Sequence, residues 1–134
     1  MEINISEKNL LEHTGLKNGT TLKIYDASRT LIGDRMLVIL LVRLEIPADS
    51  LTYTNAGKEL PSADEIRAAL GDPVRWEYTK QRRFIDKREK DEVLGILHAD
   101  FNANMRPYIL HPEFPARYVK KQLEKQRRPS NWYK

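Results

Sequence analysis

The sequence predicts an α+β fold, in which helices pack on an antiparallel sheet of three to five strands and the last helix ends in a basic tail. Some stretches alternate apolar and polar residues, others repeat apolar residues at helical spacing, and turn signals separate them. A length of 134 residues suits one domain. We place this domain at residues 1–128 and a flexible C-terminal tail at 129–134.

The N-terminal third of the chain contains signals for several elements. A capping serine and a closing glycine predict a short helix over residues 6–15. Alternation of apolar residues predicts a strand at 21–25. Gly33–Asp34 lies between two stretches of strand-like composition, so we expect a hairpin turn there and a longer strand at 35–46.

The strand predicted at 35–46 is apolar on both faces. Every second residue is apolar along its whole length, and Leu37, Ile39 and Leu41 make the opposite face apolar as well. An antiparallel strand that is covered on one side only would alternate with polar residues. Each face therefore needs a cover. We predict a homodimer in which these three side chains face either the subunit interface or a covering helix.

The C-terminal half predicts three helices and a strand. A capping box and a closing glycine bound a helix at 63–70, and alternation predicts a strand at 74–85. Apolar residues at helical spacing predict the next helix at 87–105. Three prolines in 107–115 favour an extended, rigid link. The last helix is expected at 114–128, where a proline ends it.

Composition excludes several kinds of site. The chain has no cysteine, so disulfides, thiolate nucleophiles and cysteine-ligated metal centres cannot form. His13, His98 and His111 are not spaced at i and i+4, as a helical metal site requires, so we predict no metal and no cofactor. Residues 1–13 lack the features of a signal peptide, and the longest apolar run, at 36–42, is too short to span a membrane. We therefore expect a cytoplasmic protein with no membrane partner.

No motif for catalysis stands out. The sequence has no G-x-S-x-G elbow and no glycine-rich phosphate loop, so no catalytic residue is assigned and a non-enzymatic role is favoured. His98 borders the apolar face of its predicted helix, as a histidine at the edge of a core would, and His111 suits a helix-entry role. An enzyme would require one of these histidines to lie in a cleft beside a carboxylate.

Residues 26–33 read DASRTLIG. They resemble the D/N-x-S-x-x-G half of the motif with which PilZ proteins bind cyclic di-GMP, and they lie on a predicted hairpin, as in that family. The glycine comes two residues late, with Leu31 in its place, and no R-x-x-x-R precedes the segment. The resemblance implies a nucleotide-ligand binder. The alternative is that Asp26, Ser28 and Arg29 form a polar bulge or turn.

Positive charge is concentrated at the C-terminus. The net charge is +4, and residues 117–134 contain seven Lys or Arg side chains against one Glu. One stripe of the predicted helix is basic: Arg117, Lys121, Lys125 and Arg128. Val119 and Leu123 lie on the opposite side, so we expect that side to dock and the stripe to face solvent. Trp132 and Tyr133 follow in the tail and add aromatic rings that can stack on bases or on a partner protein.

A second basic cluster, formed by Lys80, Arg82 and Arg83, directly precedes Phe84. For both clusters the alternative is a solvated face, because lysine and arginine solubilise terminal helices and keep edge strands from aggregating. The sequence thus leaves three hypotheses. The first is a non-enzymatic cytosolic scaffold that self-associates and binds an unidentified protein partner. The second is a nucleic-acid-binding protein that uses residues 117–134, aided by 80–83. The third is a small enzyme or PilZ-like nucleotide binder.

Overall fold

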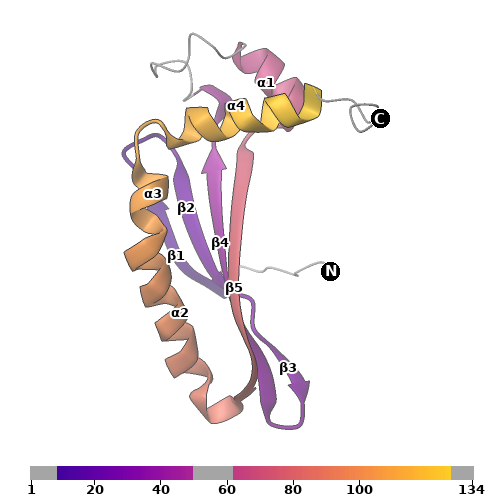
Figure 1. Ribbon diagram of the computed structural model, residues 1–134, viewed down its shortest axis with the longest axis vertical. Helices are drawn as coiled ribbons and strands as arrows, with labels where there is room; N and C mark the ends of the chain where they lie inside the picture. The colour runs from indigo at the N-terminus through magenta and orange to yellow at the C-terminus, as the bar shows by residue number, and fades with distance from the viewer. Residues whose placement is uncertain (1–8, 50–61, 128–134) are drawn as a thin grey trace.

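The computed structural model describes residues 9–49 and 62–127, and within these ranges the chain forms an α+β fold. The strands are β1 (Leu10–Gly15), β2 (Thr21–Asp26), β3 (Arg29–Ile32), β4 (Arg35–Ile46) and β5 (Val74–Asp86). The helices are α1 (Ala63–Leu70), α2 (Lys90–Asn104), α3 (Arg106–Leu110) and α4 (Phe114–Arg127), and a short 3-10 turn, η4 (Lys87–Glu89), precedes α2. Figure 1 shows a curled antiparallel sheet with helices packed on it. The predicted fold class is confirmed.

Strand β4 is the centre of the sheet. β5 pairs with it along one edge, while β2 and β3 share the other edge and β1 lies outside β2. The chain between β2 and β3 stays bonded to β4: the Ala27 N–H donates to the Ile39 carbonyl at 3.0 Å, and the Ile39 N–H donates to Ser28 Oγ at 2.9 Å. The hydroxyl thus replaces a backbone acceptor at an irregularity in the edge.

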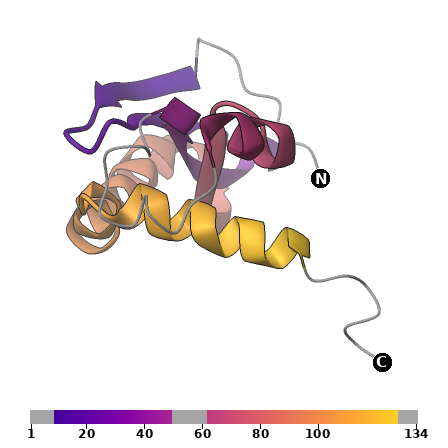
Figure 2. The same cartoon turned by 90° about the horizontal axis from the view of Figure 1, so that it is seen from above.

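One face of the sheet carries the main hydrophobic core. Strand β4 contributes every second residue to this core. Helices α2, α3 and α4 lie over the sheet (Figures 1 and 2). Helix α2 inserts Leu94, Leu97 and Phe101, all buried and at the helical spacing that predicted this helix. Helix α4 inserts Val119 and Leu123, which are also buried. The two helices therefore lie on the sheet through apolar stripes at helical spacing.

The opposite face of β4 is also buried. Leu37, Ile39 and Leu41 are each at most 3% exposed in a single chain. Both faces of this strand are therefore covered, as its composition requires. Because the three side chains are already shielded without a second copy, their burial does not by itself require a dimer, and the homodimer stays a prediction.

Local signals for turns and caps are confirmed. Gly33 has φ +55° in the β3–β4 turn, a conformation that glycine adopts without strain. Ser62 caps α1, where its Oγ accepts from the Glu65 N–H at 3.2 Å, and Gly71 follows the helix with φ +87°. Asp86 caps the helical segment before α2 by accepting from the Arg88 N–H at 2.9 Å. These signals act within a few residues, which is why a sequence reveals them.

The helix predicted at 6–15 is wrong over the described part, because residues Leu10–Gly15 form strand β1. Residues 6–8 lie outside the described ranges. Leu10, Glu12 and Thr14 are half-buried while the residues between them are exposed, which is the alternation of a strand. The backbone of this segment is bonded to β2, so a tertiary contact overrides the local capping signal.

The extended link predicted at 107–115 is also wrong. Residues Arg106–Leu110 form α3, and α4 already begins at Phe114. Pro107 and Pro115 lie in the first turns of these helices, where the missing N–H has no intrahelical partner to lose. In addition, Asn18 Nδ2 donates to the Ile109 carbonyl at 2.9 Å and holds the end of α3 against the β1–β2 turn. Two of the three prolines therefore lie where helices start, and Pro112 lies in the turn between α3 and α4.

Candidate functional site

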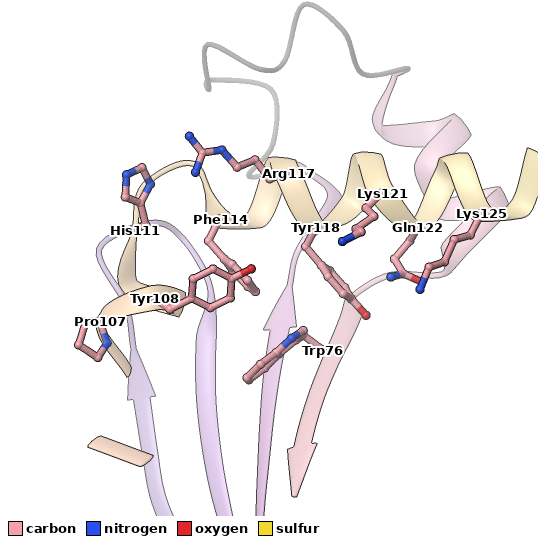
Figure 3. A pocket seen from close by; sticks show the side chains of 10 residues that line it. All are labelled: Trp76, Pro107, Tyr108, His111, Phe114, Arg117, Tyr118, Lys121, Gln122 and Lys125. Carbon is pink, nitrogen blue, oxygen red and sulfur yellow. The ribbon is translucent and has the colours of Figure 1, made fainter. Parts of the chain in front are cut away.

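A pocket of about 530 Å³ lies at the end of the sheet where β5, α3 and α4 meet. Its lining combines four aromatic side chains with three cationic ones (Figure 3). The aromatic residues are Trp76, Tyr108, Phe114 and Tyr118. The cationic residues are Arg117, Lys121 and Lys125. Pro107, His111 and Gln122 complete the lining, which contains no aspartate or glutamate.

The aromatic rings are in mutual contact around Phe114. Its ring centroid lies 5.8 Å from that of Trp76 and 5.0 Å from that of Tyr108, both in edge-to-face arrangements, and 6.0 Å from that of Tyr118. Phe114 is 4% exposed whereas Tyr108 is 59% exposed. A buried ring thus supports rings that reach the surface, and contacts of this kind hold their orientation.

Tyr118 fixes one wall of the pocket. Its hydroxyl donates to the Arg75 carbonyl on β5 at 3.1 Å, which ties α4 to the edge of the sheet. Burial raises the pKa of Tyr118, and the negative charge of Glu77 raises it further. The phenol therefore stays protonated and keeps its donor role across the physiological range.

The predicted basic stripe forms the rim of the pocket. Because Val119 and Leu123 dock on the core, Arg117, Lys121 and Lys125 are exposed on α4 and line the pocket. Their spacing of four residues corresponds to about 6 Å of helix rise. The exposure of these three side chains agrees with the helical pattern, and their role in binding stays a prediction. Arg128, Trp132 and Tyr133 lie outside the described residues.

The cations of the stripe are poorly neutralised. Among residues 9–49 and 62–127, no carboxylate lies within 4 Å of the Lys121 or Lys125 ammonium group. Arg117 Nη2 lies 3.6 Å from Glu113 Oε1, a loose pair one helical turn away. Cationic side chains with few carboxylate partners thus lie beside aromatic rings. This combination favours an anionic ligand that carries a flat ring.

The second basic cluster lies elsewhere on β5. Lys80 pairs with Asp100 of α2, and the hydrogen bond with Asp100 raises the pKa of Lys80. Arg82 and Arg83 are exposed, and Arg82 Nη1 donates to the Gln81 carbonyl at 3.1 Å. None of the three lines the aromatic pocket. The structure therefore does not bring the two predicted clusters into one pocket.

The histidines lie in different settings. His111 lines the pocket, and its Nδ1 accepts from the Glu113 N–H at 3.1 Å in the turn before α4, as a helix-entry role requires. His98 Nε2 lies 3.5 Å from Glu12 Oε1 at the edge of the core. Arg106 Nη2 contacts the same oxygen at 2.6 Å. Neither this pocket nor the neighbouring one described below contains a histidine beside a carboxylate.

A smaller pocket of about 380 Å³ adjoins the first and shares Tyr118 and Gln122 with it. It runs past the turn between α1 and β5. The side chain of Gln122 thus lies where the two hollows meet. A ligand longer than one ring and one charged group could continue from the first hollow into the second.

In the segment that resembles the PilZ motif, Asp26 and Ser28 make structural contacts with neighbouring parts of the sheet and with α2. Asp26 Oδ1 accepts from the Ser28 N–H at 2.9 Å, and the other carboxylate oxygen pairs with Lys90 of α2. Burial acts to raise the pKa of Asp26, but the hydrogen bonds from Lys90 and Ser28 outweigh it and lower the pKa. This geometry agrees with the bulge that was the alternative explanation of these residues.

The sequence did not reveal the aromatic part of the site. Trp76, Tyr108 and Tyr118 lie on three separate elements, and no spacing in the sequence connects them. The one local signal was Phe114 followed by Tyr118 at i+4, beside the basic stripe. In the described part of the chain no group of three His, Asp or Glu side chains could hold a metal ion. No helix there is long and apolar enough to cross a membrane.

No family model matches the chain, and no curated protein or solved structure shows a match to it. The fold and the site therefore define it only as a class: an α+β protein with a curled antiparallel sheet and an aromatic pocket rimmed by cations.

Proposed function

We propose that this chain is a non-enzymatic binding protein for single-stranded nucleic acid and that the aromatic pocket is its binding site. One observation carries the proposal: four aromatic rings and three cations, two of them without a carboxylate partner in the described residues, line the same hollow. Proteins that bind single strands stack bases on aromatic rings and hold phosphates with lysine and arginine. The pocket offers both groups within one site.

A single strand suits the pocket better than a duplex. Tyr108 presents an exposed ring at the rim, while Phe114 is buried behind it. A base can stack on such a ring only when its own face is free, which is the case in an unpaired strand. The cations on α4 then lie along one side of the rings, where the phosphates of the same strand would follow.

The salt dependence of binding tests the basic rim. We expect fluorescence anisotropy with labelled oligonucleotides to show binding by the full chain that weakens with salt. Three phosphate contacts correspond to a slope of about −2 in log K against log salt for a single strand. Lys121→Gln should reduce this slope by about 0.7. Lys17→Gln is the matched control, because Lys17 is exposed in the β1–β2 turn and does not line the pocket, and it should leave the slope unchanged.

The aromatic rim has its own test. Tyr108→Leu should weaken binding by about 5-fold to 150-fold, since stacking on one ring contributes about 1–3 kcal/mol per base. Tyr108→Phe keeps the ring and should bind as the wild type does. Tyr108 is mostly exposed, so neither change should alter folding. If the wild-type chain binds no oligonucleotide even at low salt, the proposal is wrong.

The predicted scaffold role and homodimer remain a second candidate. Leu37, Ile39 and Leu41 are buried in one chain, so self-association would need other apolar surface, such as Ile96 on α2, which is 57% exposed. Sedimentation velocity over a range of protein concentrations tests it. A species of twice the 15.7 kDa chain mass supports the dimer, and a single 15.7 kDa species at every concentration contradicts it.

A further inference from the structure

Phe84 has an unusual backbone conformation. In the described ranges it is the one non-glycine residue with positive φ, at +55°. Sterics between Cβ and the following carbonyl disfavour this region for every residue except glycine and, to a lesser extent, asparagine and aspartate. It arises at an irregularity of the β4–β5 pair, where Arg83 and Phe84 together oppose Leu37. Bulges of this kind re-aim side chains, and they occur often beside functional sites.

The positive φ of Phe84 is not offset by burial of its side chain. The Phe84 side chain is 63% exposed, so packing inside the fold does not compensate for the unfavourable φ. Strain without compensation inside the chain is typical of residues that contact a ligand. Arg82 and Arg83 directly precede Phe84 and are exposed, and neither has a carboxylate within 4 Å among the described residues. Phe84 is thus an exposed ring, and the two residues before it carry exposed guanidinium groups that have no carboxylate partner in the described residues.

We infer that Phe84, Arg82 and Arg83 form a second contact site for the same nucleic-acid strand. The ring of Phe84 stacks on a base, and the two guanidinium groups bind the flanking phosphates, for which their planar geometry is suited. The inference rests on the function proposed above and adds to it: the ligand is a strand several nucleotides long and not a single nucleotide.

The distance between the two sites sets the length of the strand. Trp76 and Phe84 belong to the same strand, β5, which runs from the end of the sheet at α4 to the end at the β3–β4 hairpin (Figure 1). Eight residues of strand correspond to about 26 Å. At about 3.4 Å per stacked nucleotide, about eight nucleotides connect the sites. In the described part of the sheet β5 pairs only with β4, so no other strand lies along its outer edge.

The test compares two oligothymidylates, of about 4 and about 16 nucleotides, which bracket the site sizes of known single-strand binders. The short strand reaches one site and the long strand reaches both. For the full chain, Phe84→Gly should weaken binding of the long strand by about 10-fold and leave binding of the short strand unchanged. Phe84→Tyr keeps the ring and should bind both strands as the wild type does.

Stability separates a ligand contact from a structural role. Glycine adopts positive φ without strain, so Phe84→Gly should leave the thermal midpoint unchanged or raise it while long-strand affinity falls. Ile32→Ala is the matched control, because Ile32 is 71% exposed at the same end of the sheet. This change should not alter the affinity for either oligothymidylate. If Phe84→Gly binds the long strand as tightly as the wild type, the second site is wrong. If neither strand binds the wild-type chain, the proposed function itself fails, and the second site with it.

Discussion

Helices α2 and α4 lie on the same face of the sheet, but their charged side chains have different partners. Around α2, charged groups connect the helical layer to the strands: Lys90 with Asp26, Asp100 with Lys80, and Arg106 with Glu12. The two lysines of α4 at the pocket have no carboxylate partner in the described residues. Helix α4 is held instead by apolar packing and by neutral hydrogen bonds, such as that from Gln126 Nε2 to the Ala69 carbonyl at 2.6 Å.

The paired charges around α2 stabilise the fold, whereas Lys121 and Lys125 of α4, which have no carboxylate partner among the described residues, are available to a ligand. The Lys90 and Asp26 side chains are 24% and 17% exposed, so removing one takes away the closest charged partner of the other in a largely dehydrated setting. Lys121 and Lys125 are exposed, so we expect the stability of the fold not to depend on their charge. Charged side chains on two helices that cover the same face of one sheet can thus have different roles.

The largest expected effect is in the core under α2. Phe101 is fully buried, and its ring lies 6.0 Å from that of Tyr78 and 5.7 Å from the guanidinium carbon of Arg106. Phe101→Ala should lower the free energy of unfolding by about 3–5 kcal/mol, because it leaves a cavity. Urea denaturation measures it. Ile96→Ala, on an exposed side of the same helix, should change stability by less than about 0.5 kcal/mol. Similar losses for both variants would contradict the packing of α2.

The next effect concerns the ion pair that attaches the start of α2 to β2. Asp26→Asn should lower the free energy of unfolding by about 2 kcal/mol, because the half-buried Lys90 loses its close partner and keeps only the exposed Asp91 carboxylate at 3.7 Å. A double-mutant cycle with Lys90→Met isolates the interaction, and we expect a coupling above about 0.5 kcal/mol. Additive losses would show that the two side chains act independently and that this pair does not fasten α2.

The sequence predicted what is decided locally. The turn at Gly33 and the cap at Ser62 depend on a few neighbouring residues, and the basic stripe of α4 follows from helical periodicity alone. Strand β1 was missed because its conformation depends on pairing with β2, and α3 was missed because Pro107 occupies a first turn that tolerates it. The conformation of Phe84 has no signal in the sequence, since glycine or asparagine normally marks positive φ.

The pocket also combines features that the sequence predicts with features that depend on tertiary packing. Its cations lie at i, i+4 and i+8 of one helix and could be found from the sequence. Its rings come from β5, α3 and α4, and only the packing of α4 across the end of the sheet brings them together (Figure 3). A site composed of side chains from distant segments has no periodicity, so composition alone could indicate a positively charged surface but not the aromatic hollow beside it.

A smaller effect is expected on the acid side of the stability profile. The hydrogen bond from Arg106 lowers the pKa of Glu12 below its ordinary value of 4.5, although burial acts in the opposite direction and Thr14 adds a second hydrogen bond. The folded pKa is thus below the unfolded one, so this stabilisation is complete above pH 4.5 and is lost as the pH falls through the folded pKa. Glu12→Gln should lower stability at neutral pH by about 1 kcal/mol and by less in acid.

Urea midpoints measured for wild type and Glu12→Gln between about pH 7 and about pH 3 test this linkage. The two curves should approach each other as the pH falls. Asp86 adds a later loss that both proteins share, because the hydrogen bonds from the side chain and backbone of Arg88 lower its pKa to about 2. If the two curves stay parallel down to low pH, the interaction of Arg106 with residue 12 contributes the same stability whether or not Glu12 is charged.

The smallest effect on stability is expected at the lysines of α4, and there its sign is informative. Lys121 and Lys125 are one helical turn apart, and like charges at this spacing repel by about 0.2–0.5 kcal/mol. Lys125→Gln should therefore leave the free energy of unfolding unchanged or raise it slightly, while it weakens oligonucleotide binding. Lys90→Gln is the matched substitution on α2 and should do the reverse, because it breaks the pair with Asp26 and lies outside the pocket. Urea denaturation and anisotropy on the same two variants measure both quantities. If Lys125→Gln destabilises the fold as much as Lys90→Gln does, the charge on α4 serves the structure, and the reason for assigning it to a ligand disappears.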